Sequence, residues 1–501
     1  MNAVARLGLA LTLAGCAAST PDLAPPTLTV GVLANPAGLD PALHASDSTF
    51  AIARDVFTTL VRLRPGTFDV VPGIASSWSV SADGTVWTFV LRPDLKFSDG
   101  TPLDANAVKF NFDRWRSTKD PNHGDAPYPA YATYFGGYDD HSLISEVDAP
   151  AQAIVVIHTT APSGTLLRDL TLPAFGIGSP KAIDFSPPEY DEVPVGAGPY
   201  EIVDVRAGEY AMLASNPEWH DAKPAFSSSI VRFIPDPLTS RLALDKSDVD
   251  VVLDPLEPEL REMAQSPAAR LFHGPSDAVC YLAFDTTRPP FSSEALRRAV
   301  EDAVDAHALA QFFGPRVSAA RGFLPAGMLG AEPALAEPHR ALDRAKALVH
   351  GAGLPAATIP FYYPAAATVL MPDPDSVANE IRSELAAANI NVDARPTAVP
   401  IVLPAADASG GLALVVSEAR SGDPDELLAP LDDGWGDATF HARIGNARST
   451  LGDPARARTY RALNAMIRDH VVAVPLVHPF AWSAARAAVK LDAYPLFADR
   501  R

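Results

Sequence analysis

The stretch VPGIASSWSVSADGTVWTFVLRPDLKFSDGTPLDANAVKFN, residues Val71–Asn111, carries the clearest local signals in the chain. It contains two Asp-Gly pairs, at residues 83–84 and 99–100. Such pairs favour tight turns, because glycine adopts a positive φ at little steric cost. The β-branched and aromatic run Val86–Leu91 lies between the two pairs and predicts a strand. The stretch therefore predicts a β-hairpin that ends in a second turn.

A helix is predicted directly after the second turn. Asp104 can accept hydrogen bonds from the first free amide groups of such a helix. Behind it, Val108, Phe112 and Trp115 recur at the spacing that places side chains on one helical face. A hairpin followed by a helix occurs in many folds, so these signals indicate a mixed α/β protein and do not by themselves identify the fold.

As a string of residues, the same stretch resembles the most recognisable segment of the family 5 extracellular solute-binding proteins, the peptide- and nickel-type receptors of ABC importers. In that family the segment reads LA-x-SW-x-x-S-x-DG-x-x-W-x-F-x-LR-x-x-x-x-F-x-DG-x-P-x-x-A-x-x-V. Many matches in one register are hard to obtain by chance. The residues of this chain at the corresponding positions are Ile74, Ala75, Ser77, Trp78, Asp83, Gly84, Trp87, Phe89, Leu91, Arg92, Phe97, Asp99, Gly100, Pro102, Ala105 and Val108.

Further matches to this family run from about Leu28 to the last fifty residues. The clearest is Tyr281–Phe291 (YLAFDTTRPPF), which resembles the family's strand-and-turn sequence YLxFNTxxPPF. The resemblance implies an α/β, two-lobed periplasmic-binding-protein type II fold of the larger three-domain kind. Domain I would be discontinuous and comprise residues 28–58, 185–279 and 477–501. Domain II would comprise residues 59–184 and domain III residues 280–476.

The composition limits the classes of partner. The chain of 501 residues carries 60 acidic and 40 basic side chains, a formal net charge of −20. Nucleic-acid binding needs a basic surface against the phosphates, so no nucleic-acid partner is predicted. The length allows two or three lobes with cores of their own. Beyond the N-terminus there is no apolar run of 18 residues, so no internal membrane span is predicted.

The N-terminus has the pattern of a secreted lipoprotein. Arg6 precedes an apolar run that ends in Leu13-Ala14-Gly15-Cys16, which resembles the bacterial lipobox. Residues 1–16 are therefore predicted to be a lipoprotein signal peptide with lipidation at Cys16, and residues 17–27 a tether. The alternative is an ordinary buried N-terminal helix. Cys280 is the one other cysteine, so we expect no disulfide and an inert thiol in an apolar strand.

No catalytic motif stands out in the sequence. It contains no HExxH, no G-x-S-x-G and no phosphate-binding GKS/T sequence. The twelve histidines are dispersed, so no metal site is predicted. The segment Val195–Tyr200 resembles a family turn and lacks the strand–GxGxxG–helix context of a dinucleotide site. We therefore predict a protein that is not an enzyme and has no cofactor.

Candidate ligand-binding residues come from three segments. The loop that begins at Ala34 and Asn35 follows the first predicted strand, and in the family this loop lines the ligand cleft. The aromatic, glycine-rich segment Tyr128–Tyr138 could stack on a ligand or belong to a core. Phe50–Leu63 is predicted to be one amphipathic helix between these segments.

The third segment departs from the peptide-binding members of the family. Those members carry G-W-x-A-D-x-x-x-P, in which the acidic residue holds the ligand's terminal ammonium. Here Ser417 replaces the tryptophan, Glu418 follows, and Arg420 replaces the aspartate. A guanidinium binds carboxylate or phosphate, so Arg420 in the cleft would favour an anionic solute. Alternatively, Arg420 faces solvent or pairs with Glu418. If Arg420 lies outside the site, the aromatic residues Tyr281, Trp435 and Trp482 are the remaining candidates.

The resemblance implies transport. The expected function is capture of a peptide-like or other small solute, and its delivery to the permease subunits of an ABC transporter. The expected location is the cell envelope, in the periplasm or at the outer face of the cytoplasmic membrane, with a lipid anchor and a monomeric body. The altered segment Ser417–Arg420 leaves an alternative open: a lipoprotein that keeps the fold, has lost transport, and acts through protein contacts in the envelope.

The lipobox can be tested directly. Cys16→Ser should leave an unprocessed or soluble protein in place of a membrane-attached one, because the thiol that would carry the lipid is absent. A single acyl chain anchors only weakly, so stable attachment needs more than one chain. Cell fractionation and intact-mass measurement of both forms provide the readout. Wild-type protein found wholly in the soluble fraction with Met1 intact would contradict lipidation.

Overall fold

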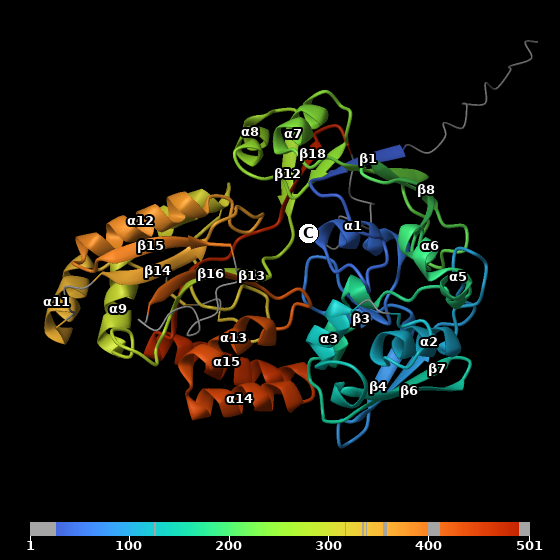
Figure 1. The fold of residues 1–501 in the computed structure, drawn as a ribbon, viewed down its shortest axis with the longest axis horizontal. Coiled ribbons are helices and arrows are strands. Elements are labelled where there is room, and N and C mark those ends of the chain that lie inside the picture. Colours follow the sequence, from blue (N-terminus) through green and yellow to red (C-terminus); the bar gives the residue numbers. More distant parts are fainter. Residues whose placement is uncertain are drawn as a thin grey trace, which may run out of the picture.

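The structure is a computed structural model that describes residues 27–124, 127–315, 317–332, 335–336, 338–353, 358–398 and 411–489. The predicted lipidation site Cys16 lies outside the described residues, as do residues 490–501. Figure 1 shows two bodies. We call the body that holds a seven-stranded and a four-stranded sheet the first lobe, and the body that holds a five-stranded sheet the second lobe.

The seven-stranded sheet of the first lobe joins parts of the chain that are far apart in sequence. At its centre, β1 (Thr27–Val32) pairs in parallel with β10 (Ser228–Phe233) and β11 (Val251–Leu253). The strand order is β12-β18-β11-β1-β10-β9-β8. The remaining strands are β8 (Tyr200–Arg206), β9 (Tyr210–Ser215), β12 (Ala269–His273) and β18 (Trp482–Arg486).

The four-stranded sheet contains both strands of the predicted hairpin in the stretch Val71–Asn111. Its order is β4-β5-β7-β6, antiparallel throughout. The strands are β4 (Ala75–Val80), β5 (Val86–Leu91), β6 (Ile144–Ala151) and β7 (Ile154–Thr159). A separate two-stranded ribbon pairs β2 (Val61–Leu63) with β3 (Val70–Pro72).

The predicted hairpin and helix are confirmed. Gly84 and Gly100 have φ values of 78° and 79° in the two turns. The Asp104 carboxylate caps α2 (Ala105–Arg116), accepting hydrogen bonds from the amides of Asn106 and Ala107 at 3.0 and 3.1 Å. The apolar face of α2 and the inward side chains of β5 belong to one buried core.

The other helices of the first lobe are short and lie against the two sheets and the ribbon. They are α1 (Asp47–Val56), α3 (Pro129–Phe135), α4 (Leu166–Asp169), α5 (Pro180–Phe185), α6 (Pro187–Glu192), α7 (Pro237–Asp245) and α8 (Glu259–Gln265), with 3-10 turns at Asp139–His141 and Pro173–Phe175.

The second lobe is built on a mixed sheet in the order β15-β14-β16-β13-β17. Its strands are β13 (Ala278–Phe284), β14 (Ile359–Pro364), β15 (Val392–Thr397), β16 (Leu412–Glu418) and β17 (Ala473–Val477). Its helices are α9 (Glu294–Ala303), α10 (Ala306–Ala310), α11 (Leu342–Ala352), α12 (Pro374–Ala387), α13 (Asp425–Trp435), α14 (Ala438–Ser449) and α15 (Asp453–His470), with a 3-10 turn at Gln311–Phe313. Cys280 is buried in β13. The lobes are joined between β12 and β13 and between β17 and β18.

One predicted element is wrong. The helix expected over Phe50–Leu63 ends at Val56, and Val61–Leu63 form strand β2. The reason is a close backbone approach at the helix end, where the Gly198 amide donates to the Val56 carbonyl at 2.8 Å. A Cβ atom on Gly196 would lie 2.1 Å from that carbonyl oxygen, so only a glycine turn fits there.

The predicted fold class, a two-lobed α/β architecture, agrees with these layers. The bounds of the three domains stay a prediction. Among the helices of the described ranges, none is long and apolar enough to cross a membrane.

A buried ion pair anchors the loop that follows β16. Arg456 on α15 and Asp423 in the loop are 0% and 1% exposed, and their charged atoms lie 2.7 Å apart. The Tyr460 hydroxyl also donates to the Asp423 carboxylate at 3.0 Å, and the Arg456 Nε donates to the Ala447 carbonyl at 3.0 Å. Removing one partner of such a pair leaves an uncompensated buried charge.

Arg456→Met should therefore lower the free energy of unfolding by about 3–5 kcal/mol. The matched control is Arg458→Met, which removes an exposed arginine from the same helix and should change stability by less than about 0.5 kcal/mol. Chemical denaturation followed by tryptophan fluorescence measures both. Equal stability of the two variants would show that the buried pair contributes nothing.

Candidate functional site

A large cleft lies between the lobes. Its volume is about 1740 Å³, and side chains from both lobes line it. The first lobe contributes parts of α1, α3 and α4, and the second lobe contributes β13, β16 and α13. A cleft between two lobes, with apolar walls and a few polar or charged groups that orient a ligand, is a common place for a small-molecule site.

Arg420 lies at the end of β16 and reaches across this cleft. Its Nη1 is 3.0 Å from Asp47 Oδ1 on α1 of the first lobe. Its Nε is 3.0 Å from Oε2 of Glu418, the last residue of β16. The guanidinium is therefore already held by two carboxylates, which includes the pairing with Glu418 that the sequence left open. The expected preference for anionic solutes stays a prediction, and this geometry does not support it.

Glu426, in the first turn of α13, forms a second link between the lobes. It accepts a hydrogen bond of 2.6 Å from the hydroxyl of Tyr134 on α3. It also accepts hydrogen bonds from the amides of Arg420 and Ser421, at 3.1 and 3.0 Å, and from the Ser421 hydroxyl. Burial raises the pKa of Glu426, and these donors oppose the rise. In Figure 1, α3 and α13 face each other where the lobes meet.

A third link involves α4 and α15. The guanidinium of Arg168 lies 2.8 Å from Asp453 Oδ2. The next residue, Asp169, is only 3% exposed and lines the cleft. Burial, together with the nearby Asp423 carboxylate, raises the pKa of Asp169 well above its usual value.

Asp277 lies on the segment that joins β12 to β13, and its side chain faces the cleft. Neither a hydrogen bond nor an ion pair joins its carboxylate to another residue in the described ranges. Burial, followed by the charge of Glu418, raises the pKa of Asp277 to about 7. Burial also raises the pKa of Glu418 itself, against the opposing effect of Arg420.

The structure brings five of the eight predicted ligand-binding residues together at the cleft. They are Ala34, Tyr281, Ser417, Glu418 and Arg420. The Tyr281 and Ser417 hydroxyl oxygens lie 3.3 Å apart.

The other three predicted residues are not among the lining residues of the described cleft, namely Asn35, Trp435 and Trp482. Asn35 is exposed, Trp435 packs against Phe440 and His470, and Trp482 is 2% exposed beside His273. A ligand role for these three stays a prediction.

Several cleft carboxylates carry no local sequence signal for ligand binding. Asp47 follows the Ser46 cap of α1, and Asp277 precedes a strand that was predicted, yet nothing in their local patterns indicates a ligand. The aromatic segment Tyr128–Tyr138 divides between the two roles open from the sequence. Tyr128 and Tyr131 are core residues, whereas Tyr134 lines the cleft.

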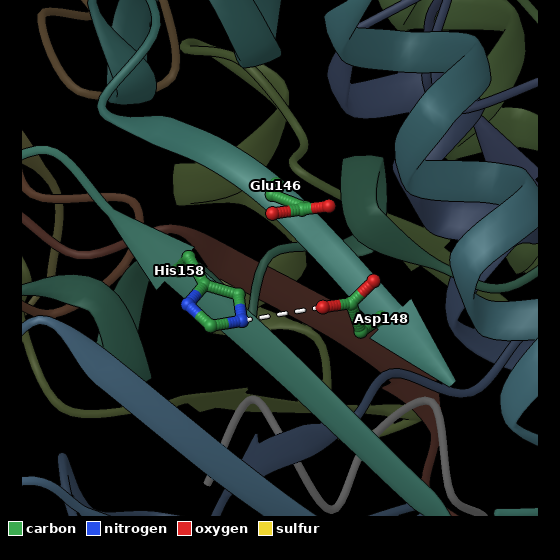
Figure 2. A group of neighbouring side chains, drawn as sticks. All are labelled: Glu146, Asp148 and His158. Atoms are coloured by element: carbon green, nitrogen blue, oxygen red, sulfur yellow. Dashed lines mark ion pairs between the residues drawn. The ribbon is translucent and has the colours of Figure 1, made fainter. Parts of the chain in front are cut away.

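A separate group of possible metal ligands lies on β6 and β7. Figure 2 shows Glu146, Asp148 and His158, whose ligand atoms lie within 4.8 Å of one another. The His158 Nε2 is 3.4 Å from Asp148 Oδ2. None of the three lines the cleft, and exposed acidic groups of this kind are common without an ion. We assign no metal to them and use them below as matched controls.

Comparison with known proteins identifies the chain. The family model for bacterial extracellular solute-binding proteins, family 5 Middle, matches residues 69–438. The chain belongs to this family. It is 28% identical over 509 residues to di/tripeptide-binding protein 2 of Pseudomonas aeruginosa (strain UCBPP-PA14), covering 96% of this chain and 94% of the relative. It is 26% identical over 514 residues to the dipeptide-binding protein of Escherichia coli (strain K12), covering 97% and 95%.

Solved structures agree on the fold. HbpA2 from Haemophilus parasuis superimposes with a TM-score of 0.84 at 22% sequence identity, covering 95% of this chain and 99% of that one. The family resemblance and the predicted fold class are thereby confirmed.

The raised pKa of Asp277 predicts a pH dependence of stability. Between its usual value near 4 and about 7, the folded protein binds more protons at this group than the unfolded chain does, so stability falls as pH rises through that window. Asp277→Asn should remove this contribution and lessen the loss between pH 4.5 and 7.5 by on the order of 1–3 kcal/mol. Denaturation curves of both proteins across this range give the difference. Parallel pH profiles would contradict the assignment.

Proposed function

We propose that this family 5 member is an extracytoplasmic solute-binding lipoprotein, which captures a peptide-like or other small solute and delivers it to the permease subunits of an ABC transporter. The observation that carries the proposal is the cleft of about 1740 Å³ between the lobes, lined from both sides. Relatives that match more than nine-tenths of the chain are named for binding dipeptides and tripeptides.

The contacts across the cleft suit a receptor that opens and closes. Among the described residues, three polar side-chain links span the lobes: Arg420 with Asp47, Tyr134 with Glu426, and Arg168 with Asp453. Each can separate without unfolding a helix or a strand, because each joins side chains from different lobes. Only two segments connect the lobes covalently, so a hinge motion there would admit and enclose a solute.

The proposed class of solute is broad because the chain differs from the peptide-binding members at two positions of the ligand-binding motif. Peptide-binding members hold the terminal ammonium with an acid where this chain has Arg420, and they carry tryptophan where it has Ser417. A peptide bound here would need a different partner for its ammonium. We therefore propose a peptide-like or other small solute and no cofactor.

The role we propose is binding without catalysis, by a monomer held at the cell envelope through Cys16. The alternative is a transport-inactive lipoprotein that works through protein contacts. A large cleft whose wall carries several carboxylates and arginines favours transport over this alternative, because a protein that no longer binds solute has no need to keep so many ionisable groups between its lobes.

The proposal predicts that the protein retains or captures a solute and closes around it. Native mass spectrometry of the protein purified from its cell envelope should show an added small molecule. Small-angle scattering should show a smaller radius of gyration after that molecule is added back to stripped protein. An empty protein whose scattering does not change with peptide, amino-acid, sugar or metal mixtures would contradict solute capture and favour the transport-inactive alternative.

A further inference from the structure

The charge on the cleft wall is unbalanced. Among the described lining residues there are nine carboxylates and five arginines. Two of these arginines are engaged outside the lining: Arg62 lies 3.9 Å from Asp221, and Arg64 lies 3.7 Å from Asp69. A third, Arg448, pairs with Asp425 at 2.9 Å. Arg54 and Arg420 act electrostatically on Glu418, while Arg456, which is not a lining residue, pairs with the lining carboxylate of Asp423 and acts on Asp169. With the paired groups set aside, Asp169, Asp277 and Glu426 are lining carboxylates that no ion pair joins to a described residue.

Four carboxylates of the cleft lining are together called the acidic strip: Asp169, Asp277, Glu418 and Glu426. Glu426 is close enough to influence both Asp277 and Asp169 electrostatically, and Glu418 acts on Asp277. Glu426 is bonded to neutral donors, and no ion pair joins Asp169 or Asp277 to a described residue. Without a bound cation, the repulsion among these carboxylates is relieved by protonation, as the raised pKa of Asp169 and of Asp277 indicates, and a cation bound among them would relieve it with the groups ionised.

We propose that the solute is cationic and presents ammonium or guanidinium groups to the acidic strip. This inference rests on the proposed function, because it assigns the solute of the same cleft. The strip draws on both lobes, with Asp169 on α4 of the first and Glu418 and Glu426 on the second. A cation bound to it contacts both lobes and stabilises the closed form.

Arg420 shows how such a cation is held. Its guanidinium joins Asp47 of one lobe to Glu418 of the other, at 3.0 Å from each, as a bound cationic group would. An anionic solute would have to take Arg420 from these two carboxylates and then lie beside the acidic strip. A cationic solute extends the same arrangement to Asp277 and Asp169, which form no ion pair with a described residue although Arg420 and Arg456 act on them electrostatically.

Two kinds of solute share this chemistry, basic peptides and polyamines. Calorimetry on stripped protein with trilysine, spermidine, trialanine and triglutamate distinguishes them. We expect trilysine or spermidine to bind at least about tenfold more tightly than trialanine, and triglutamate to bind weakest. Tighter binding of trilysine identifies a basic peptide, and tighter binding of spermidine identifies a polyamine.

Substitutions locate the site. Asp277→Asn and Glu418→Gln should each weaken the preferred cation by about tenfold to a hundredfold. The matched controls Asp148→Asn and Glu146→Gln, on β6 away from the cleft, should leave its affinity unchanged. Arg420→Gln should keep or strengthen cation binding, because it releases Asp47 and Glu418, whereas an anion-binding Arg420 predicts loss. Circular dichroism confirms that each variant is folded.

Failure of this inference differs from failure of the proposed function. Equal or tighter binding of trialanine or triglutamate, or a neutral or anionic solute found by native mass spectrometry, overturns the cationic assignment and leaves solute capture intact. If none of the four probes binds, the co-purified solute provides the test: a cationic solute supports the assignment, and a neutral or anionic one overturns it. If no solute is found by either method, the proposed function fails and the cationic assignment fails with it.

Discussion

The loop between β16 and α13 depends on the buried pair of Arg456 and Asp423. Asp423 is held by Arg456 and Tyr460 from α15, and its carboxylate in turn accepts from the Asp425 amide at the start of α13. This loop carries Arg420 and leads into Glu426. The ion pair of Arg456 and Asp423 therefore fixes where the side chains of Arg420 and Glu426 enter the cleft. A charge pair that is expensive to bury is well suited to this task, because few alternative loop conformations keep it satisfied.

The same loop is also constrained from the other lobe. Gly422 has a φ of 73°, and a Cβ atom there would lie 2.7 Å from a ring carbon of Phe68, which belongs to the first lobe. Phe68 packs in a core cluster whose other members come from the second lobe. The cleft wall is therefore shaped by a buried pair on one side and by close interlobe packing on the other. The side-chain hydrogen bonds and ion pairs between the lobes are polar, whereas Phe68 adds an apolar contact that also has to separate when the lobes open.

The sequence predicts local elements well where the chemistry is local. Asp104, the two Asp-Gly turns and the face of α2 could be assigned because caps, turns and helical periodicity involve residues close in the chain. The end of α1 could not, because the Gly198 amide that meets the Val56 carbonyl arrives from a segment far away in sequence. Cleft residues divide in the same way: Glu418 and Arg420 follow from a motif, while Asp47 and Asp277 join them only through the arrangement of the lobes.

The family fold therefore does not by itself decide the charge of the solute that the cleft accepts. In the motif, Arg420 stands where the peptide-binding members have an acidic residue. Taken alone, this replacement suggests a cleft of positive charge. In three dimensions the new cation is neutralised by Asp47 and Glu418, and the carboxylates of Asp277 and Asp169 still face the cleft. The electrostatic character of a cleft is a sum over side chains from several elements. A single replacement such as that at Arg420 therefore changes where a charge lies in the cleft and does not by itself decide the sign of the net charge of the cleft.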